Sequence, residues 1–347
     1  MARSRAPAVL LALSAVASAL AACGPDAEPE TAGGALIPLL AARQDQVQRL
    51  QLRGPGSKVL VTLQRENGEW RLGERAGWPA DSTRVAQFLL QLAQARRVEA
   101  KTASAAMYPR LGVEDVADPD GGGTELALSG RGFDQGLLIG KPHKPSGGRY
   151  VRLRGQARAW LTDADLGFDA DPASWIEHRL VDVPLARVER VRIRPRNSAA
   201  FALVQREDRF RPDDAPSAAM GDSHAGDAIA AALQAFDIED VGVDDGGQVA
   251  AQQLDFELVD GAVLQVAVWR DGQRDWVRLR PSLDAARADA WARQSGQPQV
   301  REHARANVAD WARRFAGRRF LLPPALADTL MLDHAQILDG STADTVP

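Results

Sequence analysis

The sequence predicts an α+β protein made of two tandem repeats, each a mainly antiparallel sheet with one main helix. Three observations carry this prediction. Apolar and polar residues alternate in many short segments, apolar residues recur at helical spacing in only a few, and one pattern occurs twice. That pattern starts at residues 47–53 (VQRLQLR) and again at residues 188–194 (VERVRIR), with Arg at the third and seventh positions of both.

Three landmarks of the two copies are separated by the same number of positions. The pairs, each 141 positions apart, are Val47 and Val188, Gln64 and Gln205, and Asp81 and Asp222. We therefore expect the copies to align without a gap as far as the first helix. The offset then becomes 126 from Tyr150 to Trp276 and 160 from Trp160 to Phe320, because loops absorb differences in length.

The first repeat opens with a predicted three-stranded meander. Its strands are marked by apolar residues at alternate positions, which are Leu50 and Leu52, then Val59, Val61 and Leu63, then Trp70 and Leu72. Residues 53–56 (RGPG) and Asn67-Gly68 supply the turns. Asp81 or Ser82 is placed to cap a helix. The apolar stripe of that helix consists of Val85, Phe88, Leu89 and Leu92.

A second meander follows in the first repeat, and the second repeat copies the whole order. The remaining strands of the first repeat are predicted around residues 98–102, 126–128, 137–139, 150–154 and 159–161. In the second repeat, Ile229, Leu233 and Phe236 mark the helix. Extra helix is expected at about 282–317, where residues 311–314 (WARR) are interpreted as core packing with solvated arginines.

The N-terminus resembles a lipobox. Arg3 and Arg5 precede an apolar run at residues 8–20 that is too short to span a bilayer comfortably, and small residues then lead to Cys23, the only cysteine. The resemblance implies cleavage between Ala22 and Cys23 and attachment of lipid to the Cys23 thiol, whose thiolate is a strong nucleophile. The alternatives are an ordinary secretory leader with an incidental cysteine and a buried structural thiol.

Composition restricts the partners. The net charge is −4 and no basic block occurs, which argues against binding to nucleic acid. No later run reaches eighteen apolar residues, so a lipid on Cys23 would be the sole attachment to a membrane. The predicted organisation is a leader (1–22), a lipidated cysteine with a tether and lead-in segment (23–45), a first repeat (46–180) and a second repeat (181–342). Residues 36–40 (LIPLL) are expected to pack onto the first repeat, with contact to a membrane as the alternative.

The search for chemistry yields no catalytic residue, metal ligand or cofactor site. The five histidines are scattered without metal-binding spacing. Residues 163–165 and 169–171 (both DAD) resemble fragments of a calcium loop, but they lack its glycine and distal glutamate, so caps and turns explain them better.

Four arginines form the candidate docking surface. Arg152 and Arg154 in the first repeat, and Arg278 and Arg280 in the second, alternate with aliphatic residues of a predicted strand. Period two directs them away from the core, so each pair would present a basic stripe to an acidic partner. The alternative is that neighbouring acids neutralise both stripes.

Seven short motifs, in this order, resemble the family of domains of unknown function called DUF4340. They lie at residues 36–40, 47–52, 70–72, 79–81, 138–140, 150–152 and 175–180. The resemblance implies an extracytoplasmic accessory of a gliding-motility-type ABC transporter, with that transporter's membrane subunits or another envelope protein as partner. It implies no catalytic motif. The lipobox, where relatives often carry a membrane helix, and the acidic glycine loop at 118–123 depart from the family pattern.

The leading hypothesis is therefore a non-enzymatic lipoprotein of the bacterial envelope. It would face the periplasm, on either membrane, and offer sheet edges or the groove between the repeats to a protein partner. A module that binds lipid or glycan in that groove is the first alternative, and it would show a deep apolar pocket lined by tryptophans. An envelope hydrolase is the second, and it would need clustered, buried carboxylates and histidines.

Overall fold

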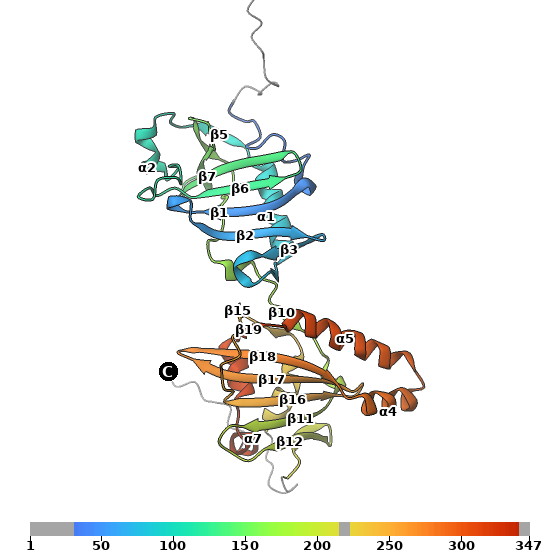
Figure 1. Ribbon diagram of the computed structural model, residues 1–347. Coiled ribbons are helices and arrows are strands. Elements are labelled where there is room, and N and C mark those ends of the chain that lie inside the picture. The colour runs from blue at the N-terminus through green and yellow to red at the C-terminus, as the bar shows by residue number, and fades with distance from the viewer. Residues whose placement is uncertain (1–30, 215–222, 340–347) are drawn as a thin grey trace, which may run out of the picture.

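The computed structural model describes residues 31–214 and 223–339. The leader, the Ala22–Cys23 cleavage position and the first part of the tether lie outside these ranges. The described chain forms two domains stacked end to end, each built on one large antiparallel sheet (Figure 1). This architecture confirms the predicted α+β fold class.

The first domain combines a nine-stranded sheet with one main helix. Its strands are β1 (Val47–Arg53), β2 (Val59–Glu66), β3 (Glu69–Leu72), β4 (Trp78–Pro79), β5 (Arg97–Ala100), β6 (Glu125–Gly130), β7 (Phe133–His143), β8 (Gly148–Leu153) and β9 (Ala159–Thr162). Its helices are α1 (Ser82–Gln94) and the short α2 (Tyr108–Leu111). The strand order across the sheet is β4-β3-β2-β1-β6-β7-β8-β9-β5.

The second domain has an eight-stranded sheet and more helix. Its strands are β10 (Arg179–Val181), β11 (Val188–Pro195), β12 (Phe201–Arg206), β13 (Arg209–Pro212), β14 (Phe236–Asp237), β15 (Asp240–Val243), β16 (Gln252–Leu258), β17 (Ala262–Asp271), β18 (Arg274–Leu283) and β19 (Arg318–Leu321). Its helices are α3 (Ala225–Ala230), α4 (Ala285–Ser295), α5 (Gln299–Phe315), α6 (Pro324–Leu330) and α7 (His334–Asp339). The sheet order is β13-β12-β11-β16-β17-β18-β19-β15, while β10 pairs with β14 separately.

Apart from β4, the two sheets have the same strand order. β3-β2-β1-β6-β7-β8-β9-β5 corresponds strand for strand to β13-β12-β11-β16-β17-β18-β19-β15. The pairing also reproduces the later offsets, because Val151 lies opposite Trp160 while Val277 lies opposite Phe320. The strand order thus supports the two-repeat prediction.

The expected gapless alignment of the repeats is wrong by one residue. β1 and β11 are equivalent at an offset of 141, because each shows the same register irregularity, at Val47 and at Val188 respectively. Leu50 then pairs with Leu63, whereas Val191 pairs with Leu203, so the offset falls to 140 in the next strand. The connection before β12 is therefore one residue shorter. Gln64 and Gln205 are the same residue type, but they do not occupy equivalent positions in the two sheets.

Helix α1 forms as the sequence predicts. The Asp81 side chain accepts hydrogen bonds from the backbone N–H of Thr83 and Arg84, at 2.9 and 3.0 Å, and so caps the helix. The predicted stripe of Val85, Phe88, Leu89 and Leu92 is buried against the sheet. Burial of each such side chain contributes about 1.5–3 kcal/mol, which makes this face the main stabilisation of the helix.

The corresponding helix of the second domain is shorter than expected. α3 ends at Ala230 and continues only as a 3₁₀ turn, so Ile229 and Leu233 are buried from helical positions but Phe236 lies on strand β14. Ala235, with a left-handed φ of 50°, turns the chain out of the helix. Asp222, the predicted match for the Asp81 cap, lies outside the described residues.

The predicted helical insertion is present as the pair α4 and α5, which project from the side of the second domain (Figure 1). Asp284 caps α4 by accepting from the N–H of Arg287 at 3.1 Å, and Gly296 ends it in a left-handed conformation. Phe315 at the end of α5 is buried, while Val308 and Trp311 pack half-buried against the core. The insertion is therefore anchored mainly through the C-terminal end of α5.

The lead-in segment packs onto the first domain, as predicted. Leu36, Ile37 and Leu40 are buried, and the backbone of Gly33 and Gly34 pairs with Arg97 of β5. In the second domain, β10 precedes β11 and pairs with β14, which lies just before β15. Within the described ranges, no helix has the length and apolarity needed to cross a membrane.

Candidate functional site: the groove between the domains

A tryptophan joins the two domains. Trp78 on β4 is fully buried, meets Phe320 of β19 edge-to-face at 5.2 Å, and donates from Nε1 to the carbonyl of Glu177 at 2.9 Å. The neighbouring Pro79 lacks an N–H, which suits a two-residue strand at the edge of a sheet. Because Trp78 and Phe320 belong to one cluster of buried residues, the two cores are continuous through this contact.

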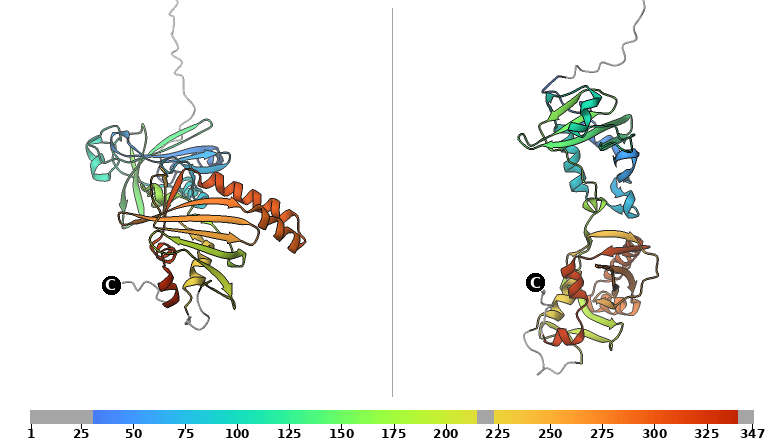
Figure 2. Two further views of the ribbon diagram at one scale, coloured as in Figure 1. Left: turned by 60° about the horizontal axis from the view of Figure 1, so that its bottom comes forward. Right: turned by 90° about the vertical axis from the view of Figure 1, so that its left-hand side faces the viewer.

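Polar contacts lock the same junction. Arg75, which follows β3, forms an ion pair with Asp240 at the start of β15, with Nη2 3.2 Å from Oδ2. Arg318 at the start of β19 donates to the carbonyl of Ala76 at 2.7 Å. The β4 end of the first sheet therefore meets the β15 end of the second, and the two domains form a narrow waist there (Figure 2).

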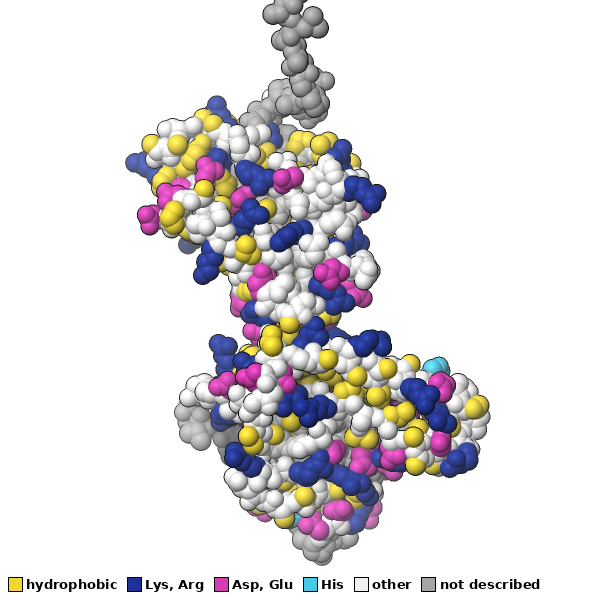
Figure 3. Space-filling view, in the orientation of Figure 1, with side chains coloured by type: hydrophobic (Ala, Val, Ile, Leu, Met, Phe, Trp, Pro, Cys, Tyr) yellow, Lys and Arg dark blue, Asp and Glu magenta, His cyan; other side chains and the backbone are white. Residues whose placement is uncertain are grey.

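A groove of about 620 Å³ opens beside this waist. It is bounded by β3, β4 and the start of α1 in the first domain, and by the end of α5 and the turn after it in the second. Its lining residues are Glu69, Trp70, Arg71, Trp78, Pro79, Ala80, Ser82, Glu177, Asp310, Arg313, Arg314 and Arg318. Figure 3 shows Lys and Arg side chains on both sides of the waist.

Arg314 and Arg318 give the groove its positive charge. Arg314 donates to the carbonyls of Leu180 and Arg179, at 3.1 and 2.8 Å, and its guanidinium lies 4.8 Å from the centre of the Trp78 ring. Arg318 donates to the carbonyl of Arg314 at 3.0 Å, which caps the end of α5. Among the described residues, neither guanidinium has a carboxylate within ion-pair distance. Burial lowers the pKa of both, and for Arg318 the nearby Arg71 adds to this effect.

The other two arginines of the groove are neutralised. Arg71 lies 2.9 Å from Glu69, and Arg313 lies 2.9 Å from Asp310, one helical turn away on α5. These pairs are exposed, so they restrict the groove little. An acidic side chain or chain terminus that entered it would meet two guanidinium groups that form no ion pair among the described residues, although Glu177, Asp310 and Glu69 act on Arg314 from a greater distance, and such groups are suited to binding an oxyanion.

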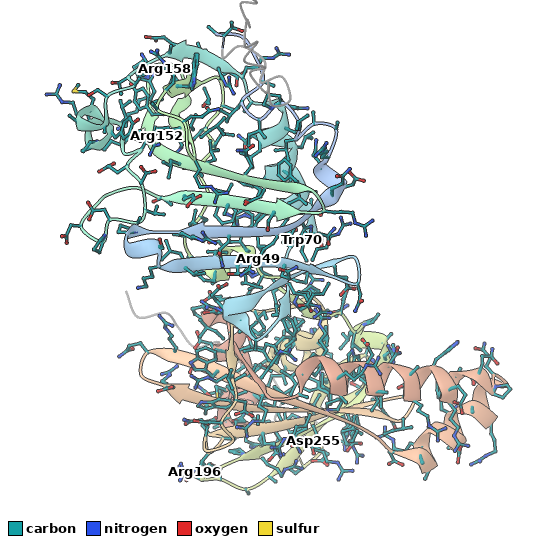
Figure 4. The ribbon with its side chains drawn as sticks, turned by 45° about the horizontal axis from the view of Figure 1, so that its top comes forward. Arg49, Trp70, Arg152, Arg158, Arg196 and Asp255 are labelled. Atoms are coloured by element: carbon teal, nitrogen blue, oxygen red, sulfur yellow. The ribbon has the colours of Figure 1, made fainter. Side chains whose placement is uncertain are left out.

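The predicted docking stripe of the first domain is not an exposed stripe. Arg152 is buried: it donates to the carbonyls of Val113 and Gln156, both at 3.0 Å, and pairs with Asp115 at 2.7 Å. Figure 4 shows it on the sheet near α2, where its guanidinium lies 4.3 Å from the ring centre of Tyr108. Arg154 pairs with Glu125 and Asp134. The loop that carries Tyr108 and Asp115 covers a face that strand periodicity alone would leave open.

The stripe of the second domain is half neutralised. Arg278 makes two hydrogen bonds to Asp244, just after β15, and its guanidinium lies 5.3 Å from the Trp269 ring. Arg280 is exposed and has no ion pair within the part of the chain that the structure describes. Of the four predicted residues, only Arg280 has the geometry that the docking hypothesis assumed.

The acidic motifs behave as turns and caps. Asp171 caps a 3₁₀ turn by accepting from Ala173 N–H at 2.9 Å, and Asp165 accepts from Gly167 N–H at 3.2 Å. The histidines stay apart: His178 contacts the carbonyl of Ile238, and His334 contacts Asp214. Across residues 31–214 and 223–339, no three potential metal ligands come together.

The family model described as "Domain of unknown function (DUF4340)" matches residues 70–256, more than half of the chain. The chain belongs to the DUF4340 family. The DUF4340 match starts in β3 and ends in β16, so it runs across the junction and includes the first-domain wall of the groove except Glu69. The α5 wall lies beyond it. No curated protein and no solved structure matches the chain.

Sequence reasoning missed the groove arginines. Residues 311–314 were interpreted as core packing with solvated arginines, which describes Trp311 and Arg313 but not Arg314. The sequence shows Arg314 beside an apolar helical stripe. It does not show that Arg314 donates to the carbonyls of Arg179 and Leu180, because these residues lie in the segment between the repeats.

Proposed function

We propose that this DUF4340 protein is a lipid-anchored, non-enzymatic accessory of the bacterial envelope whose interdomain groove binds an acidic segment of a partner protein. The lipobox at Cys23 supports the anchor, since two or more acyl chains hold a protein on a membrane durably. The family resemblance favours the membrane subunits of an ABC transporter as the partner. The anchor places the protein on the periplasmic side, on either membrane.

One observation carries the binding proposal: Arg314 and Arg318 face a groove with only carbonyl groups as partners. Each guanidinium loses part of its hydration because it is partly buried. Charge-assisted hydrogen bonds to a bound carboxylate would replace those lost contacts with water. The junction that carries both arginines is already locked by Trp78 and by the Arg75–Asp240 pair. The site therefore needs little ordering when a ligand binds, which favours affinity.

The lining favours a peptide carboxylate over an apolar ligand. Trp70 and Trp78 line the groove, but they are only 7% and 0% exposed, so neither offers a ring face for a sugar or an acyl chain. The accessible side chains are arginines, acids and Ser82. This lining argues against the lipid- or glycan-binding alternative.

A photo-crosslinking comparison in intact cells tests the groove. A photoreactive amino acid at Ser82, in the groove, should crosslink to one partner, whereas the same group at Leu90, exposed elsewhere on α1, should not. Arg313→Glu should abolish the Ser82 crosslink because it reverses charge at the rim. Arg305→Glu is the matched control: both arginines are exposed on α5 and pair with the acid three residues earlier, but Arg305 lies outside the groove. Equal crosslinking in the two variants would contradict the proposal.

The anchor has its own test. Cys23→Ser should leave the protein uncleaved or free in the periplasm. A variant that still matures to normal size and stays on membranes after a high-salt wash would contradict the lipoprotein assignment.

A further inference from the structure

The end of the first domain that carries the lead-in segment is the β5 edge. Gly33 N–H donates to the carbonyl of Arg97 at 2.6 Å, and Arg97 N–H donates to Gly34 at 2.9 Å, so the chain enters beside this strand. β5 is the last strand of its sheet, at the opposite edge from β4 and the junction. The described chain thus begins at the end of the molecule farthest from the second domain (Figures 1 and 2).

Because the two domains share one strand order, this edge can be compared with its counterpart in the second domain. Its counterpart in the second domain, β15, is covered, because Asp240 docks on Arg75 of the first domain. Within the described chain, the lead-in segment covers only the start of β5, at Arg97, and no second domain docks there. The first domain therefore leaves the rest of this sheet edge open, whereas the second domain uses the equivalent edge for docking.

Cations and apolar side chains gather along this edge. We define the basic edge as Arg96, Val98, Lys101, Met107, Arg110 and Arg158. Val98 and Met107 are 49% and 37% exposed. Hydrogen bonds hold its parts together, since Lys101 N–H donates to the carbonyl of Ala159 at 2.9 Å and the Tyr108 hydroxyl donates to the carbonyl of Ala157 at 2.7 Å. Figure 4 shows Arg158 at this end of the first domain.

The charge of the basic edge is only partly compensated. Lys101 pairs with Glu99 at 2.7 Å, and Asp163 accepts a hydrogen bond from the backbone N–H of Arg96 at 2.8 Å. Among the described residues, Arg96, Arg110 and Arg158 have no ion-pair partner, although Arg96 donates to the carbonyl of Gly33 at 3.1 Å. A net positive surface with exposed apolar side chains is suited to anionic headgroups.

The covalent chain limits where a membrane can lie. Eight peptide steps separate Cys23 from Thr31, the first described residue. At about 3.5 Å per step they span no more than roughly 28 Å in any conformation. A lipid on Cys23 would therefore hold the β5 end within that distance of the bilayer surface.

We propose that the basic edge of the first domain rests on anionic phospholipid headgroups, so that the protein stands on the membrane with its groove and second domain held away from it. This inference rests on the proposed lipid anchor. It adds a second, electrostatic attachment and fixes which end of the molecule faces the bilayer. The groove is left facing the aqueous side, where a protein partner can reach it.

The test uses the full lipidated chain on vesicles. Ala106→Cys places a fluorophore beside the basic edge, and Val249→Cys places one on the second domain; Cys23, the natural cysteine, is consumed by acylation. On vesicles that contain phosphatidylglycerol, the label at 106 should be shielded from an aqueous quencher and the label at 249 should not. Phosphatidylcholine vesicles should leave both accessible.

Charge reversal completes the test. Arg110→Glu with Arg158→Glu should restore quenching at position 106, whereas Arg196→Glu with Arg293→Glu, exposed arginines of the second domain, should not. In the unacylated Cys23→Ser chain, each reversed edge arginine should weaken partition onto phosphatidylglycerol vesicles by about fivefold or more. A lipidated chain that floats with the vesicles but shows equal quenching at 106 on both lipids overturns the inference and leaves the anchor standing. A chain that floats with neither vesicle contradicts the anchor, and the inference with it.

Discussion

The two domains share one strand order, but they differ at their ends and in their insertions. The first domain has β4 at the end of its sheet, and the described residues of the second domain include no equivalent strand. The first inserts a loop with α2 between β5 and β6, whereas the second inserts α4 and α5 between β18 and β19. β4 and the end of α5 are the two elements that meet across the groove. Among the described residues, the parts that differ between the copies, rather than the shared strands, thus build the candidate site.

The side chains of Arg152 and Arg278 also show a shared position with different surroundings in the two copies. They occupy equivalent places on β8 and β18, and each has a carboxylate partner and an aromatic ring. Arg278 takes its carboxylate from Asp244, directly after β15, while Arg152 takes Asp115 from the inserted loop. The position after β5 holds Lys101 instead of an acid. Each copy pairs the arginine at this position with a carboxylate, but the partners come from different segments.

The largest effect is expected at the junction. Trp78→Ala should reduce the free energy of unfolding by about 3–5 kcal/mol, because it leaves a cavity between the two cores. It should also split the thermal transition into two. Trp160→Ala, which removes a buried tryptophan inside the first domain, should cost a similar amount without uncoupling the domains. Calorimetry distinguishes the two variants, and a single transition in Trp78→Ala would contradict this account of the junction.

The next largest effect on stability is expected at Arg152 of the first domain. Arg152→Ala should cost about 2–3 kcal/mol, because the carbonyls of Val113 and Gln156 lose their buried donor. Arg158→Ala, which changes an exposed arginine between β8 and β9 that has no ion pair among the described residues, should cost less than about 0.5 kcal/mol. Urea denaturation measures both. Equal, small losses would mean that Arg152 is a solvated residue after all.

A smaller effect on stability, which depends on pH, should distinguish Asp244, the partner of Arg278, from Asp115, the partner of Arg152. Burial of Asp244 is the largest single influence and opposes its ionisation. The hydrogen bonds from Arg278 and from Gly246 N–H, together with the charges of Arg278 and Arg280, outweigh it and hold the pKa of the carboxyl below its ordinary value. Its stabilisation is therefore complete above the unfolded pKa of about 3.9 and is lost as pH falls through the lower folded value.

Asp244→Asn should accordingly cost about 1–2 kcal/mol near neutral pH, and the difference from wild type should vanish in acid. Asp115→Asn removes the partner of the equivalent arginine. Because Asp115 is 66% exposed and Asp244 is 11% exposed, its effect should be smaller. Denaturation curves collected from neutral to acid pH decide this, and a cost for Asp244→Asn that persists unchanged in acid would rule out the linkage.

The smallest effect is expected at Arg280. This exposed side chain makes no ion pair within the described residues, so Arg280→Ala should change stability by less than about 0.5 kcal/mol. A larger loss, measured by thermal melting, would reveal a role in folding that the contacts do not explain.

Periodicity predicted most of the fold because it depends on local burial. The stripe of α1, its Asp81 cap and the strand offsets of 126 and 160 follow from which residues face the core. Periodicity failed at Arg152, because a loop distant in sequence covers its side of the strand. It failed at Phe236 because one left-handed residue ends the helix early. The groove was expected between the repeats, but its residues could not be named, since the waist joins segments such as Ala76 and Arg318 that share no local pattern.

Two copies of one fold are docked as a single rigid body with a preformed groove. Pulsed electron–electron double resonance between spin labels tests this rigid docking directly. In a Cys23→Ser background, labels at Leu90 on α1 and at Val249 in the second domain occupy exposed positions on opposite sides of the junction. The account predicts one narrow distance distribution, which broadens when Trp78 is changed to Ala. A broad distribution in the otherwise unaltered protein would mean that the domains move independently, and it would remove the groove as a built site.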